Sequence, residues 1–186
     1  MPSMKILLIA GGWSSEREVS LTGARGMQEA LLKRGHAVTF FDLLENFDEL
    51  LETARQHDFA LINLHGSPGE DGLVQAMLEK AGCPYQGSGP SGSFLALNKA
   101  AAKQIFRIAG LPTADWEFLP VRPAEGWEPR LPWPLFVKTT TGGSSLRLGR
   151  ATNRQELDAL MDEIFAAGEG VLIEPQLPGK EITCGI

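Results

Sequence analysis

The sequence predicts an α/β protein: an open, parallel α/β sheet first, then a small α+β part with an antiparallel sheet. Two observations carry this prediction. Buried apolar runs alternate with helical patterns up to residue 81, and beyond residue 116 the apolar runs become short and separated by turns. Strand–helix alternation is typical of parallel sheets covered by helices. The glycine-rich segment at 87–92 is interpreted as the linker between the two parts.

The first part opens with residues 5–10 (KILLIA), a continuous apolar run that favours a buried parallel strand. Ser15 and Glu18 have capping-box spacing and predict the start of a helix that runs to about Arg34. The following elements are expected as strand, helix, strand and helix, at residues 37–41, 47–54, 59–64 and 71–81.

The second part is expected to begin with one helix over 93–109. Alternating runs predict three strands, an amphipathic helix and a further strand, at residues 116–119, 134–138, 146–151, 155–167 and 171–174. Another strand is expected to begin at residue 181.

The composition is that of an ordinary globular protein, with 43% hydrophobic and 22% charged residues. A formal net charge of −6 without a basic block argues against a nucleic-acid partner. The first apolar run stops at Gly11, so neither a signal peptide nor a membrane span is expected, and the cytoplasm is the expected location. Cys83 and Cys184 match no metal spacing and are expected to be reduced packing residues.

Two loops after parallel strands carry groups that suit a small ligand. Glu16 follows Gly11 and Gly12, where its carboxylate could receive a substrate ammonium, although acids in a first turn also stabilise the helix dipole. His65 ends the third strand and precedes three glycines, so it is either structural or close to a ligand. Ligands of open α/β sheets bind at the carboxyl ends of strands, which favours a substrate site here.

A loop of small residues, TTTGGSS, follows Lys138. Backbone amides at Gly143 and hydroxyls at Ser144 and Ser145 could close over phosphates, and the alternative is a flexible Gly/Ser hairpin. Lys99 could bind adjacent phosphates together with Lys138.

A possible base-binding hinge lies further along the chain. Glu174 and Leu177 bracket a strand end that could present polar groups to an adenine edge, and Glu181 could bind ribose hydroxyls. Simple solvent exposure is the alternative for both acids.

Five stretches together resemble the D-alanine–D-alanine ligase family of ATP-grasp enzymes. They are residues 11–23 (GGWSSEREVSLTG), 65–89 (HGSPGEDGLVQAMLEKAGCPYQGSG), 95–103 (LALNKAAAK), 137–149 (VKTTTGGSSLRLG) and 172–186 (LIEPQLPGKEITCGI). The resemblance runs essentially from residue 5 to residue 186. It implies an N-terminal pre-ATP-grasp substrate domain at 1–92, a central ATP-grasp subdomain at 93–178, and the first strand of a truncated C-terminal domain at 179–186.

The resemblance also implies a reaction. ATP phosphorylates the carboxylate of one D-alanine, and the amino group of a second D-alanine attacks the acyl phosphate, which gives the dipeptide used in peptidoglycan. This chemistry depends on positioning and charge neutralisation. The resemblance implies that ATP phosphates are bound by Lys99, Lys138 and the loop residues Gly143, Ser144 and Ser145. It implies that the first D-alanine is bound by Glu16, His65 and Ser144, of which Glu16 and Ser144 would be catalytic. Adenine would be contacted by Glu174 and Leu177, and ribose by Glu181.

The chain departs from the family pattern in three ways. Thr139 stands where the family usually has proline, Leu146 and Arg147 replace a small glycine segment, and Asn98 replaces an acid. Family members also continue well past residue 186. The implied Mg²⁺ ligands and the arginine that stabilises the transferring phosphoryl group lie in that further part, so the chain alone is expected to be inactive.

Two alternatives stay open at this point. One is a ligase of the same family with a different second substrate, such as a D-hydroxy acid. The other is a non-catalytic fragment that binds a nucleotide or a partner. The resemblance further implies a homodimer formed through the N-terminal domain.

Overall fold

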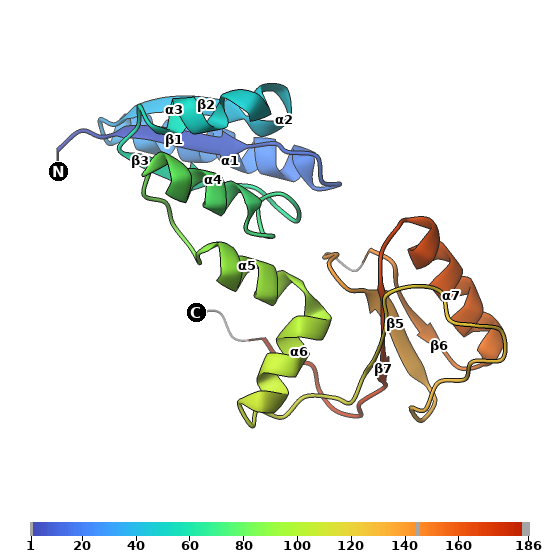
Figure 1. The fold of residues 1–186 in the computed structure, drawn as a ribbon. Helices are drawn as coiled ribbons and strands as arrows, with labels where there is room; N and C mark the ends of the chain where they lie inside the picture. The colour runs from blue at the N-terminus through green and yellow to red at the C-terminus, as the bar shows by residue number, and fades with distance from the viewer. Residues whose placement is uncertain (1, 144–145, 184–186) are drawn as a thin grey trace. The chain divides into compact units, whose positions relative to one another are not determined.

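The computed structural model describes residues 2–143 and 146–183. By internal contacts the chain divides into two compact units, Met1–Leu97 and Asn98–Ile186. Figure 1 labels the elements of both.

The first unit is a three-stranded parallel sheet in the order β2-β1-β3. In chain order its elements are β1 (Lys5–Ala10), α1 (Arg17–Lys33), β2 (Ala37–Asp42), α2 (Leu43–Asn46), η1 (Phe47–Glu49), α3 (Leu50–Ala54), β3 (Phe59–Ile62), α4 (Leu73–Ala81) and α5 (Pro90–Leu97). The parallel α/β part predicted from the sequence is therefore confirmed.

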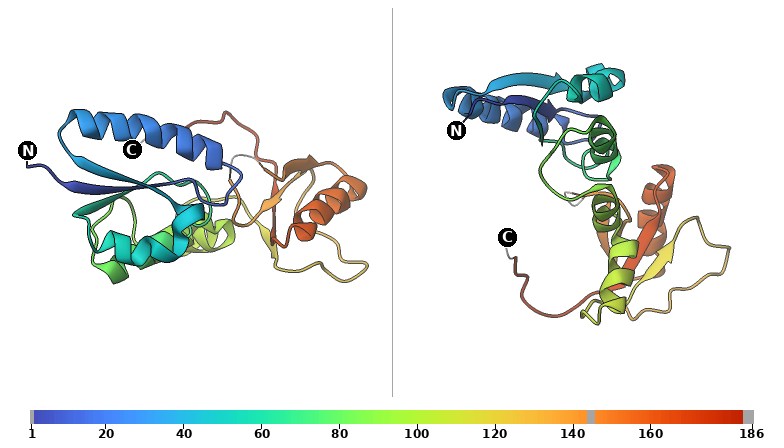
Figure 2. Two further views of the ribbon diagram at one scale, coloured as in Figure 1. Left: turned by 90° about the horizontal axis from the view of Figure 1, so that it is seen from above. Right: turned by 60° about the vertical axis from the view of Figure 1, so that its left-hand side comes forward.

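Helices cover both faces of this sheet, because alternate residues of β1 point to opposite sides. Leu8 and Ala10 pack against Ala24 of α1, whereas Leu7 and Ile9 join the cluster that contains α3 and α4. Figure 2, left, shows α1 on one side of the strands and α3 on the other. The burial of both faces explains why the first strand is a continuous apolar run.

The second unit is an antiparallel sheet in the order β4-β7-β5-β6. Its elements are α6 (Lys99–Ile108), β4 (Glu117–Leu119), β5 (Leu135–Thr139), β6 (Leu148–Ala151), α7 (Arg154–Ala166) and β7 (Val171–Pro175). The core lies between one face of this sheet and α7, which contributes Leu157, Met161 and Ile164. The predicted α+β part is confirmed as well.

Several local predictions were wrong. The Ser15–Glu18 capping box does not form: a backbone bond from Arg17 to Ser14 starts the helix later, with Glu16 as the N-cap and no side-chain cap bond. Residues 47–54 are helical as predicted, in the form of a 3₁₀ turn followed by a short α-helix. Residues 87–92 are not wholly a linker, because α5 begins at Pro90, a residue suited to a helix start.

The single helix expected over 93–109 is two helices. Asn98 adopts an extended conformation (φ −79°, ψ 100°), and its side chain accepts a hydrogen bond of 3.0 Å from the Ala101 amide. This N-cap ends one helix and begins the next. The strand expected from residue 181 is absent over 181–183, where no described strand offers a pairing partner, and 184–186 lie outside the described residues.

Cys83 is a buried free thiol, as predicted, and Cys184 falls outside the described part of the chain. In the part that the structure describes, no helix has the length and apolar character needed to cross a bilayer.

Glycine is required at the start of α4. Gly72 has φ +91°, and a Cβ there would lie 2.3 Å from the carbonyl oxygen of Pro90.

We expect Gly72→Ala to lower the free energy of unfolding by about 3 kcal/mol or more, because a left-handed conformation and a backbone clash act together. Gly82, at the other end of α4, is the matched control: its φ is +74°, but a Cβ would meet nothing within 4 Å. Gly82→Ala should cost only about 1 kcal/mol. Equal losses in urea unfolding would contradict this reading.

Candidate functional site

The antiparallel sheet presents a pocket on the face opposite its core. In β5, Leu135, Val137 and Thr139 are buried, so Phe136 and Lys138 point to the other face. The strand register places Glu174 of β7 beside Phe136, and Leu148 of β6 beside Lys138. Sequence alternation and strand pairing therefore gather apolar and charged groups on one surface.

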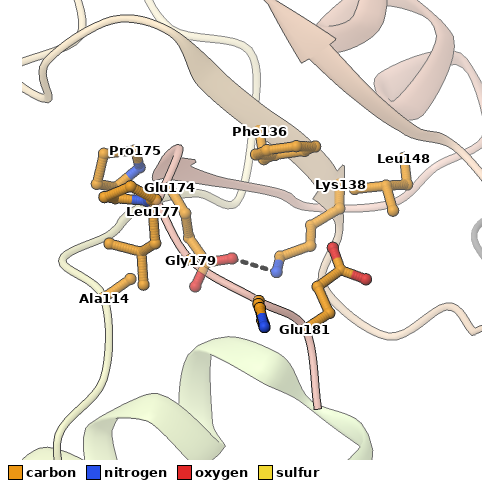
Figure 3. Close-up of a pocket in the computed structure, with 11 residues that line it drawn as sticks. Ala114, Phe136, Lys138, Leu148, Glu174, Pro175, Leu177, Gly179 and Glu181 are labelled. Carbon is orange, nitrogen blue, oxygen red and sulfur yellow. Dashed lines mark ion pairs between the residues drawn. The ribbon is translucent and has the colours of Figure 1, made fainter.

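These side chains line a cavity of about 460 Å³. Leu177, Gly179 and Glu181, from the segment after β7, border the same cavity, and Figure 3 shows them around Lys138 and Glu174. Two residues with proposed adenine and ribose contacts, Leu177 and Glu181, thus lie in one pocket with Glu174. The pocket has apolar walls with a few charged groups, which is typical of small-molecule sites.

Glu174 is shared between two lysines. Its Oε1 lies 2.5 Å from the Nζ of Lys103, and its Oε2 forms an ion pair with Lys138. Its side chain is only 13% exposed. Burial by itself would raise the pKa of the Glu174 carboxyl, but hydrogen bonds and charges of the two lysines outweigh it and hold that pKa below its ordinary value.

Lys99 lies at the start of α6 and is fastened to the loop after β5. Its backbone amide donates to the Thr140 carbonyl at 2.9 Å, and its ammonium donates to the Gly142 carbonyl. Lys99 and Lys138 line a smaller cavity of about 160 Å³ together with Gly143. Burial, and then the charge of Lys138, lower the pKa of Lys99. An anion held between these two ammonium groups would relieve their repulsion.

The threonines after Lys138 shape this loop. Thr139 Oγ1 accepts a hydrogen bond of 3.1 Å from the Gly142 amide, and Thr140 Oγ1 donates to the Gly170 carbonyl at 2.7 Å. Thr141 Oγ1 donates to Glu169 at 2.6 Å. A proline at position 139 could not supply the hydroxyl that accepts from Gly142. Thr139 therefore helps to hold the loop through this hydrogen bond.

Arg147 has φ +51°, a left-handed conformation that favours glycine. The family's usual glycine segment suits this backbone better than the arginine does. Ser144 and Ser145, assigned by resemblance to phosphates and to the first D-alanine, lie outside the described residues.

Glu16 and His65 lie in the first unit, on the loops that follow β1 and β3. Ser20 ties these loops together: its hydroxyl accepts from the Gly11 amide at 2.8 Å and donates to the Asn63 carbonyl. The Asn63 side chain returns a hydrogen bond of 2.7 Å to the Ser20 carbonyl. The side chains of Glu16 and His65 are half-buried. Because β1 and β3 are neighbouring parallel strands, the loops that carry these two residues lie at the same edge of the sheet.

Sequence reasoning missed Phe136 and Leu148, which line the second-unit pocket, and Lys103, which is paired with the pocket residue Glu174. Phe136 lies two residues from Lys138, so strand alternation already placed it on the lysine face. Lys103 lies four residues after Lys99 on one helix, which puts the two on the same side. No spacing rule pairs Leu148 with Lys138, because their register follows from the loop between β5 and β6.

Within residues 2–143 and 146–183, no group of three acidic, histidine or cysteine side chains could hold a metal ion. The resemblance implies Mg²⁺ ligands beyond residue 186, outside the described residues.

Comparison with known proteins gives a consistent result. A sequence profile of the family described as "D-ala D-ala ligase C-terminus" matches residues 105–186. The chain is 75% identical over 183 residues to a D-alanine–D-alanine ligase of Desulfovibrio desulfuricans, and 62% identical over 183 residues to one of Nitratidesulfovibrio vulgaris. Each alignment covers 98% of this chain and 60% of the relative.

The fold agrees with the sequence. A crystal structure of D-alanine–D-alanine ligase from Bacillus anthracis complexed with ATP matches with a TM-score of 0.84 at 35% identity. The match covers 95% of this chain and 60% of that one. The fold of this chain is thus similar to that of the matching part of a D-alanine–D-alanine ligase structure.

The chain is thus similar to D-alanine–D-alanine ligases along 98% of its own length. It spans about 60% of the length of the relatives it matches.

The coupling of Glu174 to two lysines makes stability depend on pH. The pKa of Glu174 is lower in the folded chain than its ordinary value of 4.5. The ionised carboxylate therefore stabilises the folded state above pH 4.5, and this stabilisation is lost as the pH falls through the lower, folded-state pKa. We expect Glu174→Gln to cost about 3 kcal/mol at pH 7, because it leaves buried ammonium groups without their anion. The loss should shrink in acid, as measured by urea unfolding between pH 7 and pH 3. Glu125→Gln, at an exposed glutamate, is the control. A pH-independent loss in Glu174→Gln would contradict the linkage.

Proposed function

We propose that this chain provides the ATP-binding site and the first-substrate site of a ligase that joins two D-alanines through an acyl phosphate, for peptidoglycan synthesis. One observation carries the proposal. Lys99 and Lys138 line one cavity beside a glycine loop, Lys138 also lines the apolar pocket, and the chain is 75% identical to a D-alanine–D-alanine ligase.

The residues of the second unit fit a nucleotide. Phe136, Leu148 and Leu177 offer apolar surface for a base, and the ammonium groups of Lys99 and Lys138 offer charge for phosphates. In this proposal Glu174 and Leu177 contact adenine and Glu181 contacts ribose. When bound, ATP supplies the phosphoryl group that activates a carboxylate.

In this proposal Lys138 pairs with Glu174 before the nucleotide binds and with a phosphate afterwards. In the structure it is paired with Glu174, and Lys99 is paired with a loop carbonyl. Phosphates would draw both ammonium groups away from these internal partners. Their role is to orient the nucleotide and to balance its charge, and Gly143, Ser144 and Ser145 would close over it.

The first D-alanine is assigned to the first unit. Glu16 would receive its ammonium, His65 would lie close to that subsite, and Ser144 would approach it from the loop. Support comes from the position of Glu16 and His65 at one edge of a parallel sheet.

The remaining parts of the proposal follow the family. We place a substrate domain at 1–92, an ATP-grasp subdomain at 93–178 and the start of a third domain at 179–186. We further propose a cytoplasmic enzyme, a homodimer through the first domain, and Mg²⁺ held by residues of the C-terminal part that the family carries beyond residue 186.

The test is phosphate release from ATP that depends on D-alanine and Mg²⁺. We expect negligible activity from this chain, because its described residues hold no metal cluster. A chain extended to the length of its relatives with the corresponding residues of the Desulfovibrio desulfuricans ligase should be active. An extended, folded chain without D-alanine dependence would overturn the ligase proposal.

Two substitutions should separate the two ligands. Lys138→Ala removes a phosphate contact and should weaken ATP binding by at least about tenfold in calorimetric titration of this chain. In the extended chain, Glu16→Gln should raise the D-alanine concentration needed for half-maximal rate far more than the ATP concentration.

Lys80→Ala is the control, since Lys80 is an exposed lysine at the end of α4. Unchanged ATP affinity in Lys138→Ala would refute the phosphate role. Equal losses for both ligands in Glu16→Gln would give Glu16 a structural role at the start of α1 and no substrate role.

A further inference from the structure

Lys103 is a buried lysine that the proposed nucleotide contacts do not use. It lies one helical turn after Lys99 on α6, and its side chain is 9% exposed, compared with 26% for Lys138. Lysine is rarely buried to this degree unless its charge is paired. Lys103 therefore calls for a specific explanation.

The ammonium of Lys103 is fully engaged within the second unit. It donates to Thr113 Oγ1 at 2.7 Å and is paired with Glu174 Oε1 at 2.5 Å. It also lies 5.2 Å from the centre of the Trp116 ring, within the range of a cation–π interaction. With these three neighbours, Lys103 is poorly placed to reach a phosphate.

The two oxygens of Glu174 have separate partners. Oε1 belongs to Lys103, and Oε2 belongs to Lys138. When Lys138 turns to a phosphate, Glu174 loses one of these partners. A carboxylate that is 13% exposed would then be left uncompensated if Lys103 were absent.

We propose that Lys103 is a positioning residue: it holds the Glu174 carboxylate against the pocket wall as an anion, so that Lys138 can leave Glu174 for a bound nucleotide. This inference rests on the proposed nucleotide site. Lys103 itself touches no reacting group and acts through Glu174.

A purely structural role is the competing explanation. Lys103 joins α6 to β7 through Glu174, so its loss could simply loosen the second unit. Stability alone cannot separate the two roles, because both explanations predict destabilisation. The ionisation of Glu174 and the coupling between the two residues can separate them.

The first measurement needs no nucleotide. The side-chain carboxyl ¹³C signal of Glu174, identified by its loss in Glu174→Gln, is followed against pH in the wild type and in Lys103→Met. The charged groups facing Glu174 are Lys103 and Lys138, with Lys180 and Glu181 lining the same pocket. We expect the pKa of Glu174 to rise in Lys103→Met, since one of its two cations is gone.

Arg107→Met is the matched control. Arg107 also lies on α6, and its guanidinium is 4.0 Å from the centre of the same Trp116 ring, but its side chain is 57% exposed. This variant removes a cation from the ring without touching Glu174, and the Glu174 titration should not move.

The second measurement is a double-mutant cycle on ATP affinity. Lys103→Met should weaken ATP binding by about tenfold, the size of a lost charge-assisted contact. The same change made in Glu174→Gln should cause little further loss, because the residue through which Lys103 acts is already neutral. If Lys103→Met does not fold, as judged by thermal unfolding, Lys103→Gln takes its place.

The outcomes separate the two proposals. A raised Glu174 pKa together with a non-additive cycle supports the positioning role. An unchanged Glu174 titration, or an equal loss of ATP affinity in both backgrounds, overturns it. If the wild-type chain binds no ATP, the proposed function fails, and the Glu174 titration alone decides whether Lys103 holds the carboxylate.

Discussion

The second unit depends on one shared carboxylate. Glu174 brings Lys103 of α6 and Lys138 of β5 to the same point on the sheet, so a helix and two strands meet through a single anion. A partly buried ion pair contributes little net stability when its desolvation is counted. Removing one member is nevertheless destabilising, because the remaining charge stays buried without a partner of opposite sign. The interaction therefore fixes where the pocket forms more than how stable the unit is.

The first unit relies on a different constraint, the parallel pairing of β1 with β3. That pairing places the ends of both strands at one edge, and the mutual hydrogen bonds of Ser20 and Asn63 hold the two following loops together. Glycines at Gly11 and Gly12, both with positive φ, let the first loop turn sharply beside them. Glu16 and His65 owe their positions to this backbone frame.

Much of the fold could be predicted from the sequence, because buried parallel strands and an amphipathic helix leave strong periodic signals. The helix boundaries that were predicted wrongly depend on hydrogen bonds between residues close in sequence. Asn98 divides a helix by capping it from within, and the turn at Ser14 delays a helix that the Ser15 spacing had placed earlier. Lys99 and Lys138 were found as candidates because lysines beside a glycine loop are distinctive. Lys103 was missed because burial of a lysine depends on partners distant in sequence, and no local pattern records them.

The pairing of Lys138 with Glu174 has a consequence for selectivity. Glu174 is tethered next to Lys138 and would compete, at a high effective concentration, with any anion that binds this lysine as proposed. A simple monovalent anion would replace one carboxylate by another charge of similar strength and gain little. A ligand that brings several charges and also fills the apolar cavity has an advantage that Glu174 cannot match. In the proposed nucleotide site, this pairing would disfavour small anions relative to a ligand that carries both several charges and an apolar group.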